Sequence, residues 1–346
     1  MNIRIYNSFM GLAAGDAVSW TSMYKRSYLL PVWTRRIRRE MDAASEGNNL
    51  TSVPVPFSLN RPSEPFNFLP ADNTEWSYFT AEILLSHGRE NFKEELLNAW
   101  VKLAESQQDI RGSVSIRGAL NNIARGIMPP KSGMENPHYF DDSALIRSVP
   151  VGLILAGEPE AAAELAETDA CVTNYEDGVW AAKFAAAFVS LLSVGSDFKF
   201  AYKNALEYLP DGSWIRRTVE STMSLADGNE SVFSILPRLQ KEIVNKEYSY
   251  GISSPETLAL ALAITAKHGD DFETALLTAN ALPRNAERLP ALTAAFAGAL
   301  SDKKVMSDEW TRSVRFLQGV CIPGLKDTDF EKFVFMLADN PRKVNL

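Results

Sequence analysis

The sequence predicts an all-α protein, and two observations support this fold class. Apolar residues recur three and four positions apart along most of the 346 residues, the spacing that places them on one face of a helix. Runs of alternating apolar and polar residues, which mark half-buried strands, are almost absent. We see no fixed-period repeat and no second class of composition, so we expect one compact domain over residues 1–346.

The helical pattern divides the chain into segments of ordinary helix length. Ser253 and Glu256 have the spacing of a capping box, and Pro255 suits a first helical turn. The segment from Asp177 to Val194 carries one charge inside it, Lys183, so we expect it to be a buried central helix. The predicted helices are 7–19, 75–88, 92–106, 115–127, 143–157, 159–167, 177–194, 198–209, 232–244, 255–269, 271–282, 289–302 and 309–320.

One segment departs from this pattern. Ser45 to Ala71 is rich in Pro, Ser and Asn, and a loop of that length inside a compact domain is either functional or disordered. Its Phe57, Phe66 and Phe68 argue for packing against the body of the protein. We therefore expect residues 45–71 to form a lid or a pocket wall.

Composition excludes several classes of function. Net charge is −8, so we expect no nucleic-acid partner, and the one basic run, Thr34 to Glu40, indicates a solvated helix face more than a phosphate-gripping lid. No apolar run approaches the roughly 20 residues that cross a membrane. Two cysteines, Cys171 and Cys321, are too few for a disulfide framework or a zinc site. These features favour a cytoplasmic protein without a membrane partner.

Acidic and amide residues gather at helix starts. For any single cluster, helix capping is the more economical interpretation, because Asp, Asn and Thr are favoured N-caps and acids suit the positive end of the helix dipole. One cap needs one side chain, however, and three of these sites offer a surplus. Converging acid-bearing helix starts would build a polyol or metal pocket. The clusters are Gly15-Asp16, Asp72-Asn73-Thr74-Glu75, Asp141-Asp142 and Asn174 with Asp177.

Three further observations bear on these clusters. Asp141 and Asp142 repel each other unless a cationic or hydroxyl-rich group lies between them. His138 lies in the loop just before them and is a ligand contact or an ordinary loop histidine. Arg147 pairs with an acid, the favoured interpretation, or with a substrate phosphate. There is no Gly-rich phosphate loop, no nucleophile elbow and no HExxH motif.

The order of four motifs resembles the ADP-ribosylglycohydrolase family. "GLAAGDAVS" resembles its opening G-L-A-x-G-D-A-L-G, and "ADNTEWSYFTAEILL" resembles its T-D-D-T followed by an apolar helix. "DDSALIRSVPVGL" resembles N-G-S-A-M-R-x-x-P-x-G-L, and "LPALTAAFAGAL" resembles the late G-G-D-T-D-T-x-A-A-x-x-G-A. The resemblance runs from about Ile5 to Val320, and each motif is short, but their order is specific.

This resemblance implies an all-α domain of orthogonally packed helices. Such enzymes cleave N- or O-ribosyl bonds in ADP-ribosylated proteins or small ADP-ribosyl molecules. Their usual members hold two Mg²⁺ ions between the T-D-D-T and G-G-D-T-D-T clusters, where the ions grip ribose hydroxyls and an acidic residue deprotonates the attacking water.

This chain departs from both metal-binding motifs. Ala71 and Asn73 replace one Thr and one Asp of T-D-D-T, and both aspartates of the late motif become apolar within Leu289 to Leu292. Mg²⁺ requires about six oxygen ligands, so we expect the dinuclear site to be lost. The stretch "PRNAERLP" beside the lost cluster contains Arg284, Asn285, Glu287 and Arg288. These charged and polar residues indicate a changed pocket, although a solvated loop would have the same composition.

Three hypotheses follow. The favoured one is a glycosidase that has replaced its metal by carboxylates and acts on a ribosyl or ADP-ribosyl small molecule, with Asp72, Glu75 and Asp142 as catalytic candidates and Asp72 or Glu75 as general base or nucleophile. The second retains a single Mg²⁺ on Asp72, Asn73 and Asp142 or Asp16. The third is an inactive protein that binds a ribosyl ligand or a partner. The substrate-binding candidates are Asp16, Asn73, Thr74, His138, Asp141, Arg147, Asn174, Asp177, Arg284 and Glu287.

Overall fold

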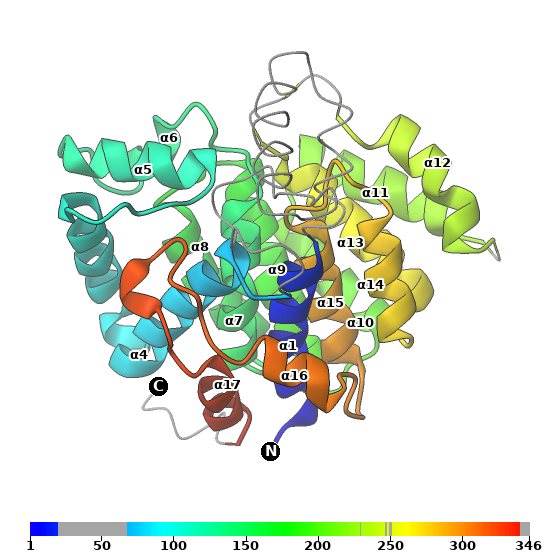
Figure 1. Ribbon diagram of the computed structural model, residues 1–346. Helices are drawn as coiled ribbons and strands as arrows, with labels where there is room; N and C mark the ends of the chain where they lie inside the picture. Colours follow the sequence, from blue (N-terminus) through cyan, green and yellow to red (C-terminus); the bar gives the residue numbers. More distant parts are fainter. Residues whose placement is uncertain (20–67, 229, 246–247, 249–250, 340–346) are drawn as a thin grey trace, which may run out of the picture.

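The computed structural model describes residues 1–19, 68–228, 230–245, 248 and 251–339, and this part of the chain is helical, without a strand (Figure 1). The predicted fold class is therefore confirmed. The α-helices are α1 (Ile3–Val18), α4 (Asp72–Glu105), α5 (Val114–Ala124), α6 (Lys131–Met134), α7 (Ser143–Ile154), α8 (Pro159–Ala170), α9 (Asp177–Ser193), α10 (Phe198–Ala205), α11 (Trp214–Ala226), α12 (Val232–Glu242), α13 (Ser254–His268), α14 (Phe272–Asn280), α15 (Leu289–Leu300), α16 (Asp308–Ser313) and α17 (Phe330–Asp339).

Helices α1 and α9 form the centre of the molecule. α1 packs along α15, and α9 packs against α7, α8 and α13, while α12 and α5 lie at the periphery (Figure 1). Every residue of α9 is buried except Trp180 and Lys183, as its apolar sequence predicts. The partly buried Lys183 pairs with Glu167 at 2.5 Å.

Two glycines permit the close approach of α1 and α15. A Cβ atom on Gly15 would lie 2.3 Å from the Pro290 carbonyl oxygen, and one on Gly298 would lie 2.4 Å from the Asn7 carbonyl oxygen. Both distances are far below van der Waals contact, so any larger residue would separate the helices. This contact fixes the C-terminal part of α1, which carries Asp16, beside the start of α15.

The observed helices differ from the predicted ones in several places. The two helices predicted over 75–106 form one element, α4, broken at Gly88, where φ is 73° and the backbone leaves the helical region. α11 and α17 were not predicted, and the last predicted helix is shorter, because α16 ends at Ser313. Except for residues 68–71, the expected lid over 45–71 and the basic run at 34–40 lie outside the described residues.

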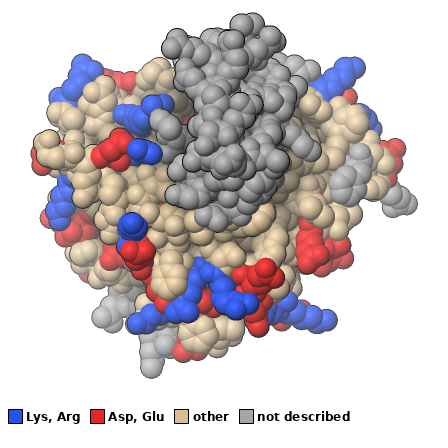
Figure 2. All heavy atoms as spheres, in the orientation of Figure 1, with Lys and Arg blue, Asp and Glu red and all other residues tan. Residues whose placement is uncertain are grey.

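The described helices include none that is both long and apolar enough to cross a membrane. On the face shown in Figure 2, acidic and basic side chains of the described residues are interspersed, without a large patch of one sign. The expected division into one domain stays a prediction.

Candidate functional site

Asp16 of α1 caps the start of α4. Its carboxylate is fully buried and accepts hydrogen bonds from the Ala71 N–H at 2.7 Å, the Thr74 N–H at 3.1 Å and the Thr74 hydroxyl at 2.8 Å. The Asn73 side-chain amide donates to the same carboxylate at 2.8 Å and to the Glu287 carbonyl oxygen at 2.7 Å. The first turn of a helix leaves unpaired N–H groups, and here an aspartate from another helix satisfies them. Asp16, Asn73 and Thr74 thus join α1, α4 and the segment before α15.

Glu75 anchors a distant loop. Its two carboxylate oxygens accept hydrogen bonds from the N–H groups of Val320 at 2.8 Å, Cys321 at 2.8 Å and Ile322 at 3.0 Å. Burial raises the pKa of Glu75, and these backbone hydrogen bonds oppose that increase. A carboxylate engaged in this way anchors the 320–322 loop to α4, and a catalytic role of Glu75 stays a prediction.

Asp72 and Asp142 meet on one guanidinium group, that of Arg288. Arg288 Nη1 lies 3.1 Å from Asp142 Oδ1, and Nη2 lies 3.4 Å from Asp72 Oδ2. The side chains of Arg288, Asp72 and Asp142 are 4%, 2% and 0% exposed. Glu287 adds a third carboxylate, with Oε1 3.5 Å from Arg288 Nη1. The starts of α4 and α7 therefore converge as expected, and Arg288, directly before α15, is the cation between them.

A pairing between two loops places α13 beside this cluster. The Asp142 N–H donates to the Ile252 carbonyl oxygen at 3.1 Å, and the Ser254 N–H donates to the Phe140 carbonyl oxygen at 2.9 Å. As a result, the Thr257 hydroxyl in the first turn of α13 donates to Asp142 Oδ2 at 2.6 Å. Asp142 is therefore held on one oxygen by a cation and on the other by a hydroxyl.

Burial dominates the electrostatics of the cluster. It raises the pKa of Asp142 to about 7, against the opposing effects of Arg288 and the Thr257 hydroxyl. Burial also lowers the pKa of Arg288, but the attraction of Asp142, Glu287 and Asp72 outweighs it, so that pKa lies above its ordinary value. Arg288 directly precedes α15, where the helix dipole disfavours a cation, so these carboxylates are what hold it there.

Asp141 is directed to different partners from its neighbour. Its Oδ1 accepts from the Ser115 hydroxyl at 2.6 Å and from the Ser143 N–H at 3.1 Å, and its Oδ2 accepts from the Ser115 N–H at 3.2 Å. The repulsion expected within the Asp141–Asp142 pair is thus relieved by hydroxyl and amide groups for one acid and by a guanidinium for the other. Asp141 joins α5 to α7.

Three other predicted binding residues have contacts within the fold. Arg147 is fully buried and pairs with Asp169 at 2.8 Å, which agrees with the favoured structural interpretation. The Asn174 amide donates to the Asp141 carbonyl oxygen at 2.8 Å, so Asn174 supports the loop that carries the acids. Asp177 accepts from the Ile215 N–H at 2.9 Å and caps α11.

A further group surrounds Tyr248, which sequence patterns did not indicate. His138 Nδ1 lies 2.9 Å from the Tyr248 hydroxyl, and Arg284 donates to the Tyr248 carbonyl oxygen. The Tyr248 ring packs on Phe140 with centroids 4.8 Å apart. Burial raises the pKa of Tyr248, and Asp141, Asp142 and Glu287 raise it further, so its hydroxyl lies in the field of the acidic cluster.

Arg288 and Thr257 are the site residues that sequence reasoning missed. Arg288 was part of a charged stretch with no signal to separate it from a solvated loop, and Thr257 lies inside a regular helical pattern. The predicted pair at the start of α13 does meet, since the Ser253 hydroxyl donates to Glu256 Oε1 at 2.8 Å, but the Ser253 side chain does not cap the helix backbone.

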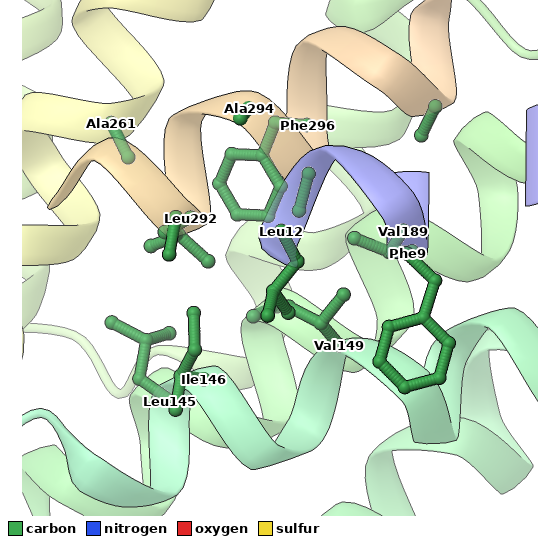
Figure 3. Close-up of a cluster of buried hydrophobic side chains, with 14 of the residues drawn as sticks. Phe9, Leu12, Leu145, Ile146, Val149, Val189, Ala261, Leu292, Ala294 and Phe296 are labelled. Carbon is green, nitrogen blue, oxygen red and sulfur yellow. The ribbon is translucent and has the colours of Figure 1, made fainter. Parts of the chain in front are cut away.

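Among the residues that the structure describes, the donors of a dinuclear magnesium centre are not assembled. Leu289 to Leu292 form the first turn of α15 and are buried, and Figure 3 shows Leu292 in the apolar cluster with Leu12, Leu145 and Ile146. Within the described residues no group of three or more His, Cys, Asp or Glu side chains could hold a metal ion. Mg²⁺ requires about six oxygen ligands, and two of the nearby carboxylates already contact Arg288. These residues do not fit the pair of ions that the family resemblance implies.

Comparisons with known proteins agree with the expected family. A sequence model described as ADP-ribosylglycohydrolase matches residues 2–340. A solved structure described as an ADP-ribosylglycohydrolase-related protein complex superposes with a TM-score of 0.61 and 17% identity, over 100% of this chain and 99% of the other. No curated protein matches the sequence. The structural likeness shows a shared fold, and the family model covers nearly the whole chain. The chain belongs to the ADP-ribosylglycohydrolase family.

Proposed function

We propose that this protein hydrolyses an N- or O-ribosyl bond of a small ribosyl or ADP-ribosyl compound without a dinuclear magnesium centre. Glycosidic hydrolysis is the chemistry of the family to which the chain belongs. The observation that carries the metal-independent form is the contact of Asp72 and Asp142 with the guanidinium of Arg288. A pair of carboxyl groups is sufficient for glycoside hydrolysis in many enzymes.

Each group in the cluster has a chemical role in this proposal. Because burial raises the pKa of Asp142 to about 7, a large fraction of this carboxyl group is protonated near neutral pH. It can then donate a proton to the leaving group, while the Asp72 carboxyl group directs water or stabilises the positive charge that develops on the sugar. Within the described residues the buried Arg288 Nε–H has no hydrogen-bond partner, which leaves one donor for a ligand oxygen.

A second candidate function is ligand binding without hydrolysis. It is favoured by the number of acids at the helix starts that serve the fold: Asp16 caps α4, Glu75 holds the 320–322 loop, and Asp141 joins α5 to α7. In that case Asp72 and Asp142 balance the charge of Arg288, and a ribosyl ligand binds without turnover.

A ribosyl-release assay separates the two candidates. N- and O-linked ADP-ribosyl compounds and nucleosides are incubated with the wild type in EDTA and in MgCl₂, and with Asp142→Asn. Asp308→Asn, at an exposed aspartate remote from the cluster, is the matched control. We expect release in EDTA that Asp142→Asn reduces at least about 100-fold, as for loss of a general acid, and that Asp308→Asn leaves intact.

Two other results would redirect the proposal. Release that EDTA abolishes and Mg²⁺ restores would overturn metal independence. Calorimetric binding of ADP-ribose without release of product from any compound would replace hydrolysis with the binding function.

A further inference from the structure

We propose that Glu256, in the first turn of α13, is a positioning residue that holds the Arg288 guanidinium against Asp142. The spacing of a capping box marks Glu256 in the sequence, yet one of its carboxylate oxygens binds groups outside α13. Only the expected effect on ribosyl release rests on the proposed function, because the position of Arg288 is a property of the fold whether or not a bond is cleaved.

Both carboxylate oxygens of Glu256 accept hydrogen bonds, and the residue is 1% exposed. Oε1 accepts from the Ser253 hydroxyl at 2.8 Å, a contact that stays within the start of α13. Oε2 accepts from the Asn245 N–H at 2.8 Å and from the Asn285 side-chain amide at 3.3 Å. Burial raises the pKa of Glu256, and these hydrogen bonds and the charge of Arg284 oppose that increase. A single carboxylate oxygen thus joins two chain segments that lie outside α13.

The contact with Asn285 leads to the cation of the cluster. The Asn285 carbonyl oxygen accepts from the N–H groups of Leu289 at 3.0 Å and Arg288 at 3.4 Å, so Asn285 closes the turn that opens α15. Asn285 is fully buried, and within the described residues its Oδ1 has no hydrogen-bond partner. Its amide donor contacts Glu256, so Glu256 orients this side chain and, through the turn, the backbone of Arg288.

The contact with Asn245 leads to Tyr248. The Asn245 side-chain oxygen accepts from the Tyr248 N–H at 3.1 Å, and the Tyr248 hydroxyl lies 2.9 Å from His138 Nδ1. Arg284, in the turn before α15, donates to the Tyr248 carbonyl oxygen. The two segments that Glu256 joins therefore also contact each other, which connects the group around Tyr248 to the turn that carries the cation.

The next residue of the same helical turn holds the carboxyl partner of the cation. The Thr257 hydroxyl donates to Asp142 Oδ2 at 2.6 Å, while Arg288 lies 3.1 Å from Asp142 Oδ1. The first turn of α13 thus holds Asp142 directly through Thr257, and holds Arg288 through Glu256 and Asn285. One helical turn sets the separation of the two charged groups, and small errors in such a separation lower reaction rates strongly.

Titration of the Asp142 carboxyl group tests the position of Arg288 without reference to catalysis. The proteins are the wild type, Glu256→Ala, Asn285→Ala and the matched control Ser253→Ala, which loses the other hydrogen bond of Glu256. The carboxyl carbon is followed by NMR in protein containing isotope-labelled aspartate, and Asp142→Asn assigns its signal. Because Arg288 lowers the pKa of Asp142, we expect the midpoint to rise by about one pH unit in Glu256→Ala and Asn285→Ala and to be unchanged in Ser253→Ala.

The two variants distinguish displacement of Arg288 from other effects. Removing the negative charge of Glu256 would by itself lower the midpoint of Asp142, so a rise reports a displaced guanidinium. Asn285→Ala changes no charge and decides the matter if Glu256→Ala does not fold. Equal midpoints in the wild type and a folded Asn285→Ala would overturn the proposal. An equal rise in Ser253→Ala would also overturn it, because that variant keeps the contact with Asn285.

Ribosyl release gives the second readout. We expect Glu256→Ala and Asn285→Ala to slow release by about 10- to 100-fold, as misplacement of a charged group does, and Ser253→Ala to retain the wild-type rate. Wild-type release by both folded variants would overturn the positioning role. A wild type that releases no product refutes the proposed function instead, and the titration of Asp142 then decides the position of Arg288.

Discussion

Replacing Asp16 by alanine should destabilise the protein strongly, although Asp16 lies in a motif that reads as part of a catalytic site. The carboxylate is fully buried and accepts from four donors on described residues, namely the Ala71 N–H, the Thr74 N–H, the Thr74 hydroxyl and the Asn73 amide. Each donor left unsatisfied costs about 1–3 kcal/mol. Taking the low end for each donor gives a loss of about 4 kcal/mol, a large share of a typical unfolding free energy of about 5–15 kcal/mol.

The matched control is Asp197→Ala. Asp197 caps α10 with one hydrogen bond, from the Phe200 N–H at 2.9 Å, at an exposed position. Loss of such a cap costs about 1 kcal/mol. Both variants are unfolded in urea and their unfolding free energies are compared with that of the wild type. If Asp16→Ala costs no more than Asp197→Ala, the carboxylate does not hold the start of α4 and the reasoning is refuted.

Three more predictions follow from the same contacts. The pKa of Asp142 is about 7 in the folded state and about 3.9 in the unfolded chain. The contribution of Asp142 to the free energy of unfolding is therefore full below about pH 4 and is lost as pH rises to about 7. Asp142→Asn should flatten the fall in melting temperature over that window. Glu75→Ala should accelerate amide hydrogen exchange at residues 320–322, where equal rates in both proteins would contradict the anchoring role. Gly15→Ala should cost about 1–3 kcal/mol through its clash with Pro290 O, whereas Gly324→Ala, with nothing within 4 Å of the added Cβ, should be nearly neutral in urea unfolding.

The helices could be predicted where apolar spacing was regular. α9 is nearly uniform in apolar residues and lies at the centre as predicted. α17 was missed although its buried residues Phe330, Phe333, Val334 and Leu337 have helical spacing, so the signal was present in the sequence. α11 carried a weaker signal, because its buried stripe is narrow and includes Thr222 among many polar residues.

The candidate site could be predicted only in part. Asp72 and Asp142 lie at helix starts, and a surplus of polar residues marked both places. The distinction between Asp142, which contacts Arg288, and Asp141, which contacts Ser115, depends on packing between helices far apart in sequence. The same holds for Glu75, whose partners lie about 245 positions away. One-dimensional patterns carry no information about such contacts.

The apolar character of Leu289 to Leu292 could be read from the sequence, but the burial of Arg288 beside them could not. Leu289 to Leu292 are plainly apolar, and they pack into the core as apolar residues do. The sequence does not distinguish Arg288, which lies next to them, from an arginine in a solvated loop, yet its side chain is 4% exposed. Its burial depends on carboxylates that α4 and α7 bring to the start of α15.

The most direct test of the account is a crystal structure of the wild type grown in millimolar MnCl₂, with anomalous diffraction data collected near the manganese absorption edge. The account predicts density for the Arg288 guanidinium between Asp72 and Asp142, and no anomalous peak among these side chains. An anomalous peak bound to Asp72 and Asp142, with Arg288 displaced from both, would contradict it.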